Sequence, residues 1–148
     1  MRSMRRRLRA LSGERGAALV EFALVLPFLM TILCATIDFG LCMYTLNNLT
    51  AAVREGGRYA AVRNPAPTVN DTAVTNRVYN YIAGLPSGQT AAQIRATISS
   101  TVPDALTGNI TVKITGYQYK AVTPIAALFG MSTITLNRTA IFRWELSS

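Results

Sequence analysis

Glu21 is the residue whose position most needs a chemical explanation. It is the only formal charge in the apolar run from Ala17 to Ile37. A carboxylate in hydrocarbon costs roughly 2.5–3.5 kcal/mol on insertion scales unless it is paired or protonated. Two explanations are open. Glu21 either lies near an interface, where it snorkels to water or takes up a proton, or it has a cationic partner at the same depth.

Cleavage of the chain after Gly16 would create such a partner. Ala17 would become a new N-terminus that carries an ammonium, and Glu21 would be the fifth residue of the shortened chain, about one helical turn away. The ammonium of the same chain or of a neighbouring subunit would neutralise the carboxylate in a low dielectric. In a helical filament this pair would set the axial register between subunits, a well-attested role of buried polar pairs.

No set of residues in the sequence predicts a catalytic site. The chain has no histidine, which excludes histidine metal sites and histidine-based catalysis. Its carboxylates are spread along the sequence, and the glycine pair Gly56-Gly57 follows a predicted helix rather than a strand, unlike a phosphate-binding loop. We therefore expect a protein that is not an enzyme and that has no metal and no cofactor.

The positive charge is concentrated at the N-terminus. The formal net charge is +8, and six arginines and one glutamate precede Gly16. The remaining basic residues are scattered among six acidic ones, without the dense basic stripe of a nucleic-acid-binding surface. A basic block beside an apolar run instead indicates membrane topology, because positive flanks stay in the cytoplasm. We expect no nucleic-acid partner.

The basic leader, residues 1–16, precedes a predicted transmembrane helix over residues 17–44. Its most apolar part spans roughly 30 Å at helical rise, the thickness of a bilayer core. Pro27 removes one backbone hydrogen bond and should kink this helix, which a membrane helix tolerates when neighbours re-satisfy the freed carbonyl. A cleaved secretory signal is the alternative, but the apolar run is long for one and no small-x-small site follows it.

Three further residues of this segment carry expectations. Asp38 lies about 26 Å beyond Glu21 along the helix, near the far interface, where water can solvate it. Cys34 and Cys42 are too far apart on a helix for an internal disulfide. We interpret both as small apolar residues that face lipid or a partner helix.

A helical stem is predicted over residues 45–64, with apolar or small residues at 3-4 spacing on one face. Glu55 and Arg58 can pair at i, i+3. Gly56-Gly57 lowers helix propensity, by about 1 kcal/mol per glycine. The pair is either a hinge or frayed end, or a place where another backbone approaches closely.

Residues 65–148 are predicted to form a small extracytoplasmic α+β head. A helix capped by Asn70 or Asp71 should run to about Ala83, with an inward face of Val74, Val78, Tyr81 and Ile82. A second helix is expected from Thr90 to about Ser99, with Ala91, Ile94 and Ile98 on one face. Period-2 alternation predicts strands from Ile110 to Tyr119 and from Thr133 to about Trp144, paired as a C-terminal antiparallel hairpin. The apolar link over 124–130 is expected to form one helical turn.

The N-terminal motifs resemble a known family. Gly16, four residues and then Glu21-Phe22 at the head of an apolar helix are similar to a type IV prepilin processing site. The longer string Arg15-Gly-Ala-Ala-Leu-Val-Glu-Phe-Ala-Leu-Val-Leu-Pro27, followed by Ile37-Asp38-Phe39-Gly40, resembles TadE-type pseudopilins of tight-adherence (Flp-type) pili. The resemblance extends to about residue 62. The pair Gly56-Gly57 departs from it, because alanine is expected there, and this bears on the stiffness of the stem.

The resemblance implies a function in pilus assembly. A membrane prepilin peptidase would cut between Gly16 and Ala17 on the cytoplasmic side, and Glu21 and Phe22 would then act in assembly and register. The mature chain would sit in the bacterial inner membrane as a single-pass protein with its head outside, or join a pilus as a minor pilin. Its partners would be other pilins or pseudopilins and the tight-adherence secretion machinery, and the pilus would serve adhesion and biofilm formation.

The same architecture leaves other functions open. The main alternative is a single-pass membrane-anchored extracytoplasmic binding or sensor module, whose head recognises a ligand. A small enzyme on a membrane anchor is a third class, which the lack of a catalytic constellation argues against.

Overall fold

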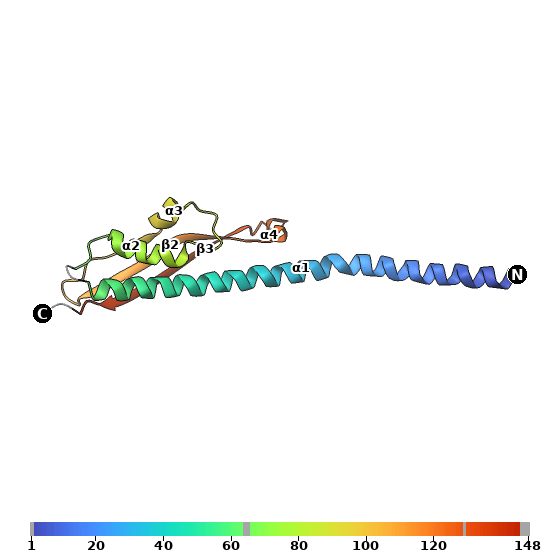
Figure 1. Cartoon of the computed structure of the whole chain (residues 1–148), viewed down its shortest axis with the longest axis horizontal. Helices are drawn as coiled ribbons and strands as arrows, with labels where there is room; N and C mark the ends of the chain where they lie inside the picture. The colour runs from blue at the N-terminus through green and yellow to red at the C-terminus, as the bar shows by residue number, and fades with distance from the viewer. Residues whose placement is uncertain (1, 64–65, 129, 146–148) are drawn as a thin grey trace.

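One long helix carries the whole N-terminal part of the chain. The computed structural model describes residues 2–63, 66–128 and 130–145, and the side chains of residues 16–63, 66–127 and 130–145. Helix α1 (Arg2–Ala61) is unbroken and therefore about 90 Å long at 1.5 Å per residue. Figure 1 shows that the rest of the chain folds beside its C-terminal half only, and the N-terminal half projects alone.

The rest of the chain forms an α+β head, as predicted. Its elements in chain order are α2 (Thr72–Ile82), α3 (Ala91–Ala96), β1 (Ile98–Ser100), β2 (Asn109–Lys120), α4 (Pro124–Leu128) and β3 (Thr133–Arg143). The three strands form an antiparallel sheet in the order β1-β2-β3. The predicted C-terminal hairpin is thus confirmed, with Asn109 opposite Arg143 at one end and Lys120 opposite Thr133 at the other.

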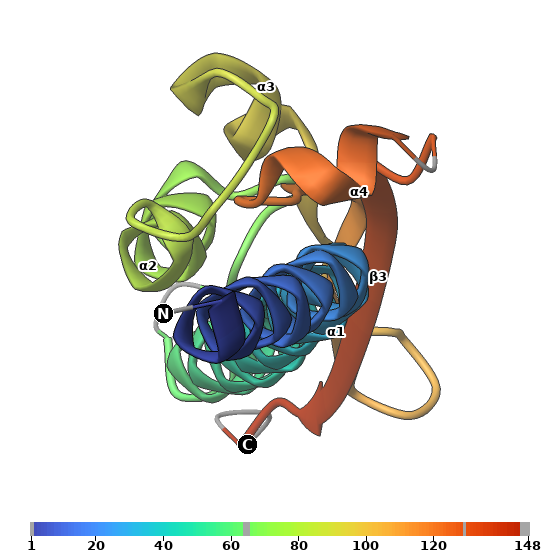
Figure 2. The same ribbon diagram turned by 90° about the vertical axis from the view of Figure 1, so that its right-hand side faces the viewer.

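Helix α1 supplies one side of the hydrophobic core. Seen along its axis, it lies between α2 and β3 (Figure 2). Side chains of α1, α2 and the three strands meet in one cluster, which includes Leu49, Val53, Val74, Val78, Ile82, Ile98, Ile110, Val112, Ile114, Tyr117 and Tyr119. Because α1 contributes buried side chains to this cluster, the stem and the head share one core.

A β-bulge keeps one face of β2 in this core along its whole length. Strict alternation from Ile110 would point Tyr117 and Tyr119 away from the core, because side chains alternate between the two faces of a strand. The register against β3 shifts between Ile114 and Tyr117, where Gly116 has φ +83°. The extra residue of the bulge returns both tyrosines to the buried face, and their exposed fractions are 0% and 1%.

Helix α2 begins where the sequence predicts. The Asp71 carboxylate accepts hydrogen bonds from the backbone N–H groups of Ala73 (2.8 Å) and Val74 (3.4 Å), the standard role of an N-cap aspartate. The predicted inward residues Val74, Val78 and Ile82 are fully buried. Tyr81 was also expected inward, and this is wrong, since its exposed fraction is 49%.

The second predicted helix is shorter than expected. A capping box of Thr90 and Gln93 starts α3, and the helix ends at Ala96. Ile98 was expected on its apolar face but lies on β1, opposite Ile114 of β2. The spacing of Ile94 and Ile98 fits a helix, but pairing with the central strand buries Ile98 and also satisfies its backbone, so the strand prevails.

Candidate functional site

The exposed half of α1, residues 16–37, holds all the residues predicted from the sequence to act in processing and assembly. Among the described residues, this helix is long and apolar enough to cross a membrane, and no residue of its most apolar window is buried. Large side chains point outward all round it, including Leu19, Val20, Phe22, Leu24, Val25, Phe28 and Leu29. A helix that is apolar on every side and uncovered by its own protein is suited to a lipid or protein environment.

Gly16 and Ala17 lie within α1, and their peptide bond is part of the helix. Apart from its chain neighbours and the backbone of its own helical turns, no heavy atom lies within 4 Å of the position that a Cβ of Gly16 would take. Glu21 is exposed and has no ion-pair partner among the side chains that the structure describes. Ala17 and Glu21 are four residues apart, so they lie on the same face of the helix.

Phe22 and Pro27 also lie on this exposed half. Phe22 is 61% exposed. Helix α1 continues through Pro27, and the Thr31 hydroxyl donates to the Pro27 carbonyl oxygen at 2.8 Å. A continuous helix can still bend, so the kink expected at Pro27 stays a prediction.

The head forms hydrogen bonds to α1 at Asp38. Its Oδ1 accepts hydrogen bonds from the backbone N–H groups of Val122 (2.9 Å) and Thr123 (3.2 Å). Its Oδ2 accepts one from the Thr123 hydroxyl, and its backbone carbonyl accepts one from the Tyr119 hydroxyl at 3.2 Å. This carboxylate was expected to be solvated by water; it is partly buried, and the loop before α4 supplies three of its hydrogen bonds.

This contact was missed because no local signal predicts it. Asp38 and Thr123 are 85 residues apart, and only the hairpin brings them together. An unexplained acid at the end of an apolar run is the one available clue, since a carboxylate at membrane depth needs hydrogen-bond donors.

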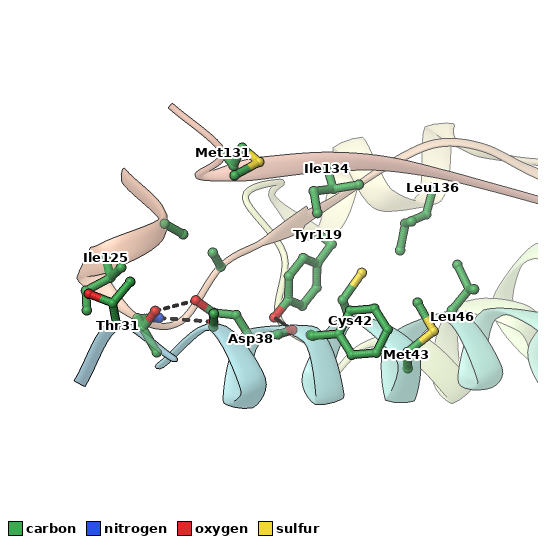
Figure 3. Close-up of a pocket in the computed structure, with 15 residues that line it drawn as sticks. Thr31, Asp38, Cys42, Met43, Leu46, Tyr119, Ile125, Met131, Ile134 and Leu136 are labelled. Carbon is green, nitrogen blue, oxygen red and sulfur yellow. Dashed lines mark hydrogen bonds between the residues drawn. The ribbon is translucent and has the colours of Figure 1, made fainter. Parts of the chain in front are cut away.

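An apolar groove of about 520 Å³ opens beside Asp38. Figure 3 shows α1 along one wall and α4 with the adjoining strand ends along the other. Its lining is almost entirely apolar and includes Phe39, Cys42, Leu46, Tyr119, Ile125, Met131 and Ile134.

Cys42 faces the head. Its exposed fraction is 8% and it belongs to the core cluster, which corrects the expectation for this residue. Cys34 is partly exposed, and both cysteines are free thiols.

Gly56 and Gly57 are packing positions. A Cβ on Gly56 would overlap Val78 of α2, and one on Gly57 would overlap the ring of Phe142 on β3. Both glycines are buried inside α1. Of the two alternatives, close approach is therefore the better description, although the groups that approach are side chains of the head rather than another backbone.

Ion pairs between side chains connect the end of α1, and the residues just after it, to α2 and its N-cap. Glu55 pairs with Arg58 (3.6 Å), as predicted, and also with Arg77 of α2 (2.7 Å). Arg63 pairs with Asp71. Burial raises the pKa of the Asp71 carboxyl, but the Arg63 guanidinium and the N–H groups at the start of α2 outweigh burial, and the pKa lies below its usual value.

The described residues contain no group of three His, Cys, Asp or Glu side chains placed to hold a metal ion. The arrangement instead offers a long helix with an apolar, uncovered half and a head fixed to its other half. These are features of a membrane or assembly protein.

Comparison with known proteins agrees with this description. A family model described as TadE-like protein matches residues 16–58. The matched segment begins at Gly16 and ends beside the glycine pair, so it covers both the exposed half of α1 and most of the half that the head covers. No curated protein and no solved structure matches the chain. The resemblance seen in the sequence is confirmed: residues 16–58 are similar to the TadE-like protein family.

Proposed function

We propose that this chain is a TadE-like pseudopilin, or minor pilin, that acts in assembly of a tight-adherence pilus and is not itself an enzyme. The observation that carries the proposal is the exposed apolar half of α1, which starts with the family match at Gly16 and is not buried by the head. A soluble protein would have to cover this surface, whereas a membrane span or a filament core uses it directly.

In this proposal the protein is the substrate of a prepilin peptidase. The basic leader keeps the N-terminus in the cytoplasm, and the peptidase cuts between Gly16 and Ala17. The head then faces the extracytoplasmic side of the inner membrane, where it meets other pilins, pseudopilins and the secretion machinery. The pilus serves adhesion and biofilm formation.

The open surroundings of Gly16 support access by the peptidase. Hydrolysis requires the bond to leave the helix, because a helical peptide bond is not extended in a protease cleft. Glycine favours this local unwinding, since it costs about 1 kcal/mol relative to alanine in a helix interior.

Intact-mass measurement of the protein recovered from membranes tests the cleavage. With an active prepilin peptidase co-expressed, the mass should correspond to a chain that begins at Ala17. Gly16→Lys should leave the chain uncut, because a lysine side chain occupies the space that the peptidase needs at this position. Gly13→Lys is the matched control in the same leader, and it should be cut normally. Normal cleavage of Gly16→Lys, or a different first residue, would contradict the proposal.

Glu21→Ala tests the assembly step separately from cleavage. We expect normal processing, since the cut lies five residues away, and loss of incorporation into filaments, since the new ammonium of Ala17 loses its carboxylate partner. Glu55→Ala provides a control carboxylate outside the span. Recovery of the Glu21→Ala protein in sheared pili at the wild-type level would rule out the register role.

A further inference from the structure

We propose that the tip of the head, residues 121–134 with α4 at its centre, inserts into the outer leaflet of the bilayer that α1 spans, and that acyl chains occupy the groove between them. The inference rests on the membrane anchoring in the proposed function. It adds a second membrane-contacting element, far from α1 in the sequence.

The first argument is depth. The tip lies alongside α1 at the level of residues 31–38, because Ile125 and Ala126 line the same groove as Thr31 and Ala35. The apolar run ends at Asp38, and Thr31 lies about 10 Å deeper at 1.5 Å per residue. Figure 1 shows α4 reaching toward the exposed half of α1, farther than the other helices of the head. Interfacial elements enter a bilayer to about 5–10 Å, which matches this overlap.

The second argument is composition. No charged residue occurs between Lys120 and Arg138, a stretch that contains the whole tip. Three large apolar side chains of the tip are exposed: Val122 (60%), Met131 (61%) and Ile134 (43%). Lys120 ends β2 directly before the tip and is exposed, so its cationic side chain can reach the headgroups.

The third argument is the backbone. Within a bilayer, exposed N–H and C=O groups need partners in the protein. The N–H groups of Val122 and Thr123 donate to Asp38, and Pro124 at the start of α4 has no N–H to satisfy. The turn that leaves the helix is bonded too: Ala121 donates to Ser132, Gly130 to Ala127 and Met131 to Ala126. These five N–H groups of the tip are therefore already hydrogen-bonded within the protein.

The groove explains why lipid is the favoured occupant. Its α1 wall continues the lipid-facing surface of the span, and Phe39 (66% exposed) and Met43 (39% exposed) line its edge. Acyl chains can enter along this wall without displacing any part of the head. The helix of a neighbouring copy is the alternative occupant, and the experiment distinguishes the two.

Depth-dependent fluorescence quenching tests the inference in the full chain. The two free thiols are first removed as Cys34→Ala and Cys42→Ala, which breaks no disulfide. Met131→Cys then carries an environment-sensitive fluorophore at the tip. Leu29→Cys reports the middle of the span. Leu106→Cys, at a position 95% exposed, reports the end of the head beyond Asn109, about 36 Å from the tip along β2.

The protein is reconstituted in phosphatidylcholine vesicles with and without spin-labelled acyl chains. We expect comparable lipid quenching at Met131→Cys and Leu29→Cys, each several-fold stronger than at Leu106→Cys. Val122→Cys should repeat the result at a second tip position. Emission from the single Trp144 verifies that each variant is folded, because its indole N–H donates to the Arg63 carbonyl at 3.1 Å in the native head.

Two results would overturn the insertion. Strong quenching at Leu29→Cys with none at Met131→Cys would show that the span is anchored but the tip stays in water. Protection of Met131→Cys from both lipid quencher and aqueous iodide, lost on dilution of protein in lipid, would show that a second copy covers the groove. Absence of lipid quenching at Leu29→Cys would instead refute the anchoring on which the proposed function depends.

Discussion

The two halves of α1 have different surfaces although they form one continuous helix. Residues 16–37 expose large apolar side chains in all directions. Over residues 49–60 the buried positions follow one face, at Leu49, Ala52, Val53, Gly56, Gly57 and Ala60. Arg54 and Arg58 are exposed on the opposite side. The first pattern suits an apolar solvent on every side, and the second suits a helix between a core and water.

The two halves of the helix also differ in side-chain size, in keeping with their different surroundings. The covered half uses small residues where α2 and β3 approach, because close contact leaves no room for a side chain. The exposed half uses leucine, valine and phenylalanine, which present a broad apolar surface. Substitutions of the same residue type in each half should therefore have very different effects on the stability of the head.

The largest contrast is expected for leucine. Leu49→Ala removes a side chain that is fully buried in the core and should destabilise the head by about 2–5 kcal/mol. Leu29→Ala, at a position 55% exposed, should leave the stability of the head unchanged. Urea unfolding of the full chain in detergent micelles, followed by Trp144 emission, measures both. Equal effects would show that the head does not depend on α1 for its core.

Replacing glycine by alanine should give a smaller contrast, in which the change destabilises the head in the covered half but not near the exposed half. Gly56→Ala places a methyl group against Val78, which is fully buried, and overpacking of this kind costs about 1–3 kcal/mol. Gly40→Ala meets no heavy atom within 4 Å, so the higher helix propensity of alanine should make it neutral or stabilising by up to about 1 kcal/mol. Thermal unfolding followed by circular dichroism compares the two. A stabilising effect of Gly56→Ala would contradict close packing at Gly56 and favour the alternative that the glycine pair is a hinge.

The smallest effect concerns the end of the covered half, and it depends on pH. The folded-state pKa of Asp71 lies below the value for an unfolded chain, since Arg63 and the α2 N–H groups outweigh burial. Asp71 therefore stabilises the head above the unfolded pKa of about 3.9, and this contribution is lost as pH falls through the lower folded pKa. At pH 7, Asp71→Asn should cost about 0.2–1 kcal/mol, the range for a partly exposed ion pair, because asparagine can still cap α2 but cannot pair with Arg63.

Urea titrations of both proteins between pH 7 and pH 2 measure this difference. It should shrink below about pH 4. Glu21→Gln is the control carboxylate on the exposed half, and it should not change the pH dependence of head stability. A difference between wild type and Asp71→Asn that stays constant down to pH 2 would mean that the Arg63 pair contributes nothing.

Much of this fold could be predicted because the signals are local. The Asp71 cap, the apolar face of α2 and the alternation in β2 and β3 each lie within a dozen residues. The exposed half of α1 was also predictable, since uniform hydrophobicity over its length has few structural solutions. The family match begins in this segment and continues into the covered half, to residue 58.

The rest depended on contacts between distant segments. Ile98 continues the spacing of a helix but pairs with Ile114 on the central strand. The bulge at Gly116 reverses the facing of the two tyrosines, which alternation alone assigns to the wrong side. Cys42 and Asp38 looked lipid-facing or solvated because nothing near them in the sequence indicates that β2 and α4 fold back over them.

Because α1 is unbroken, the direction in which the head faces is fixed relative to Glu21. Each residue turns an α-helix by about 100°, so a one-residue insertion between Glu21 and Gly56 would rotate the head by that angle and raise it by only about 1.5 Å. In an assembly whose register is set at Glu21, the number of residues between the two positions thus selects which side of the head points outward. The length of this helix therefore determines the rotation of the head about the helix axis.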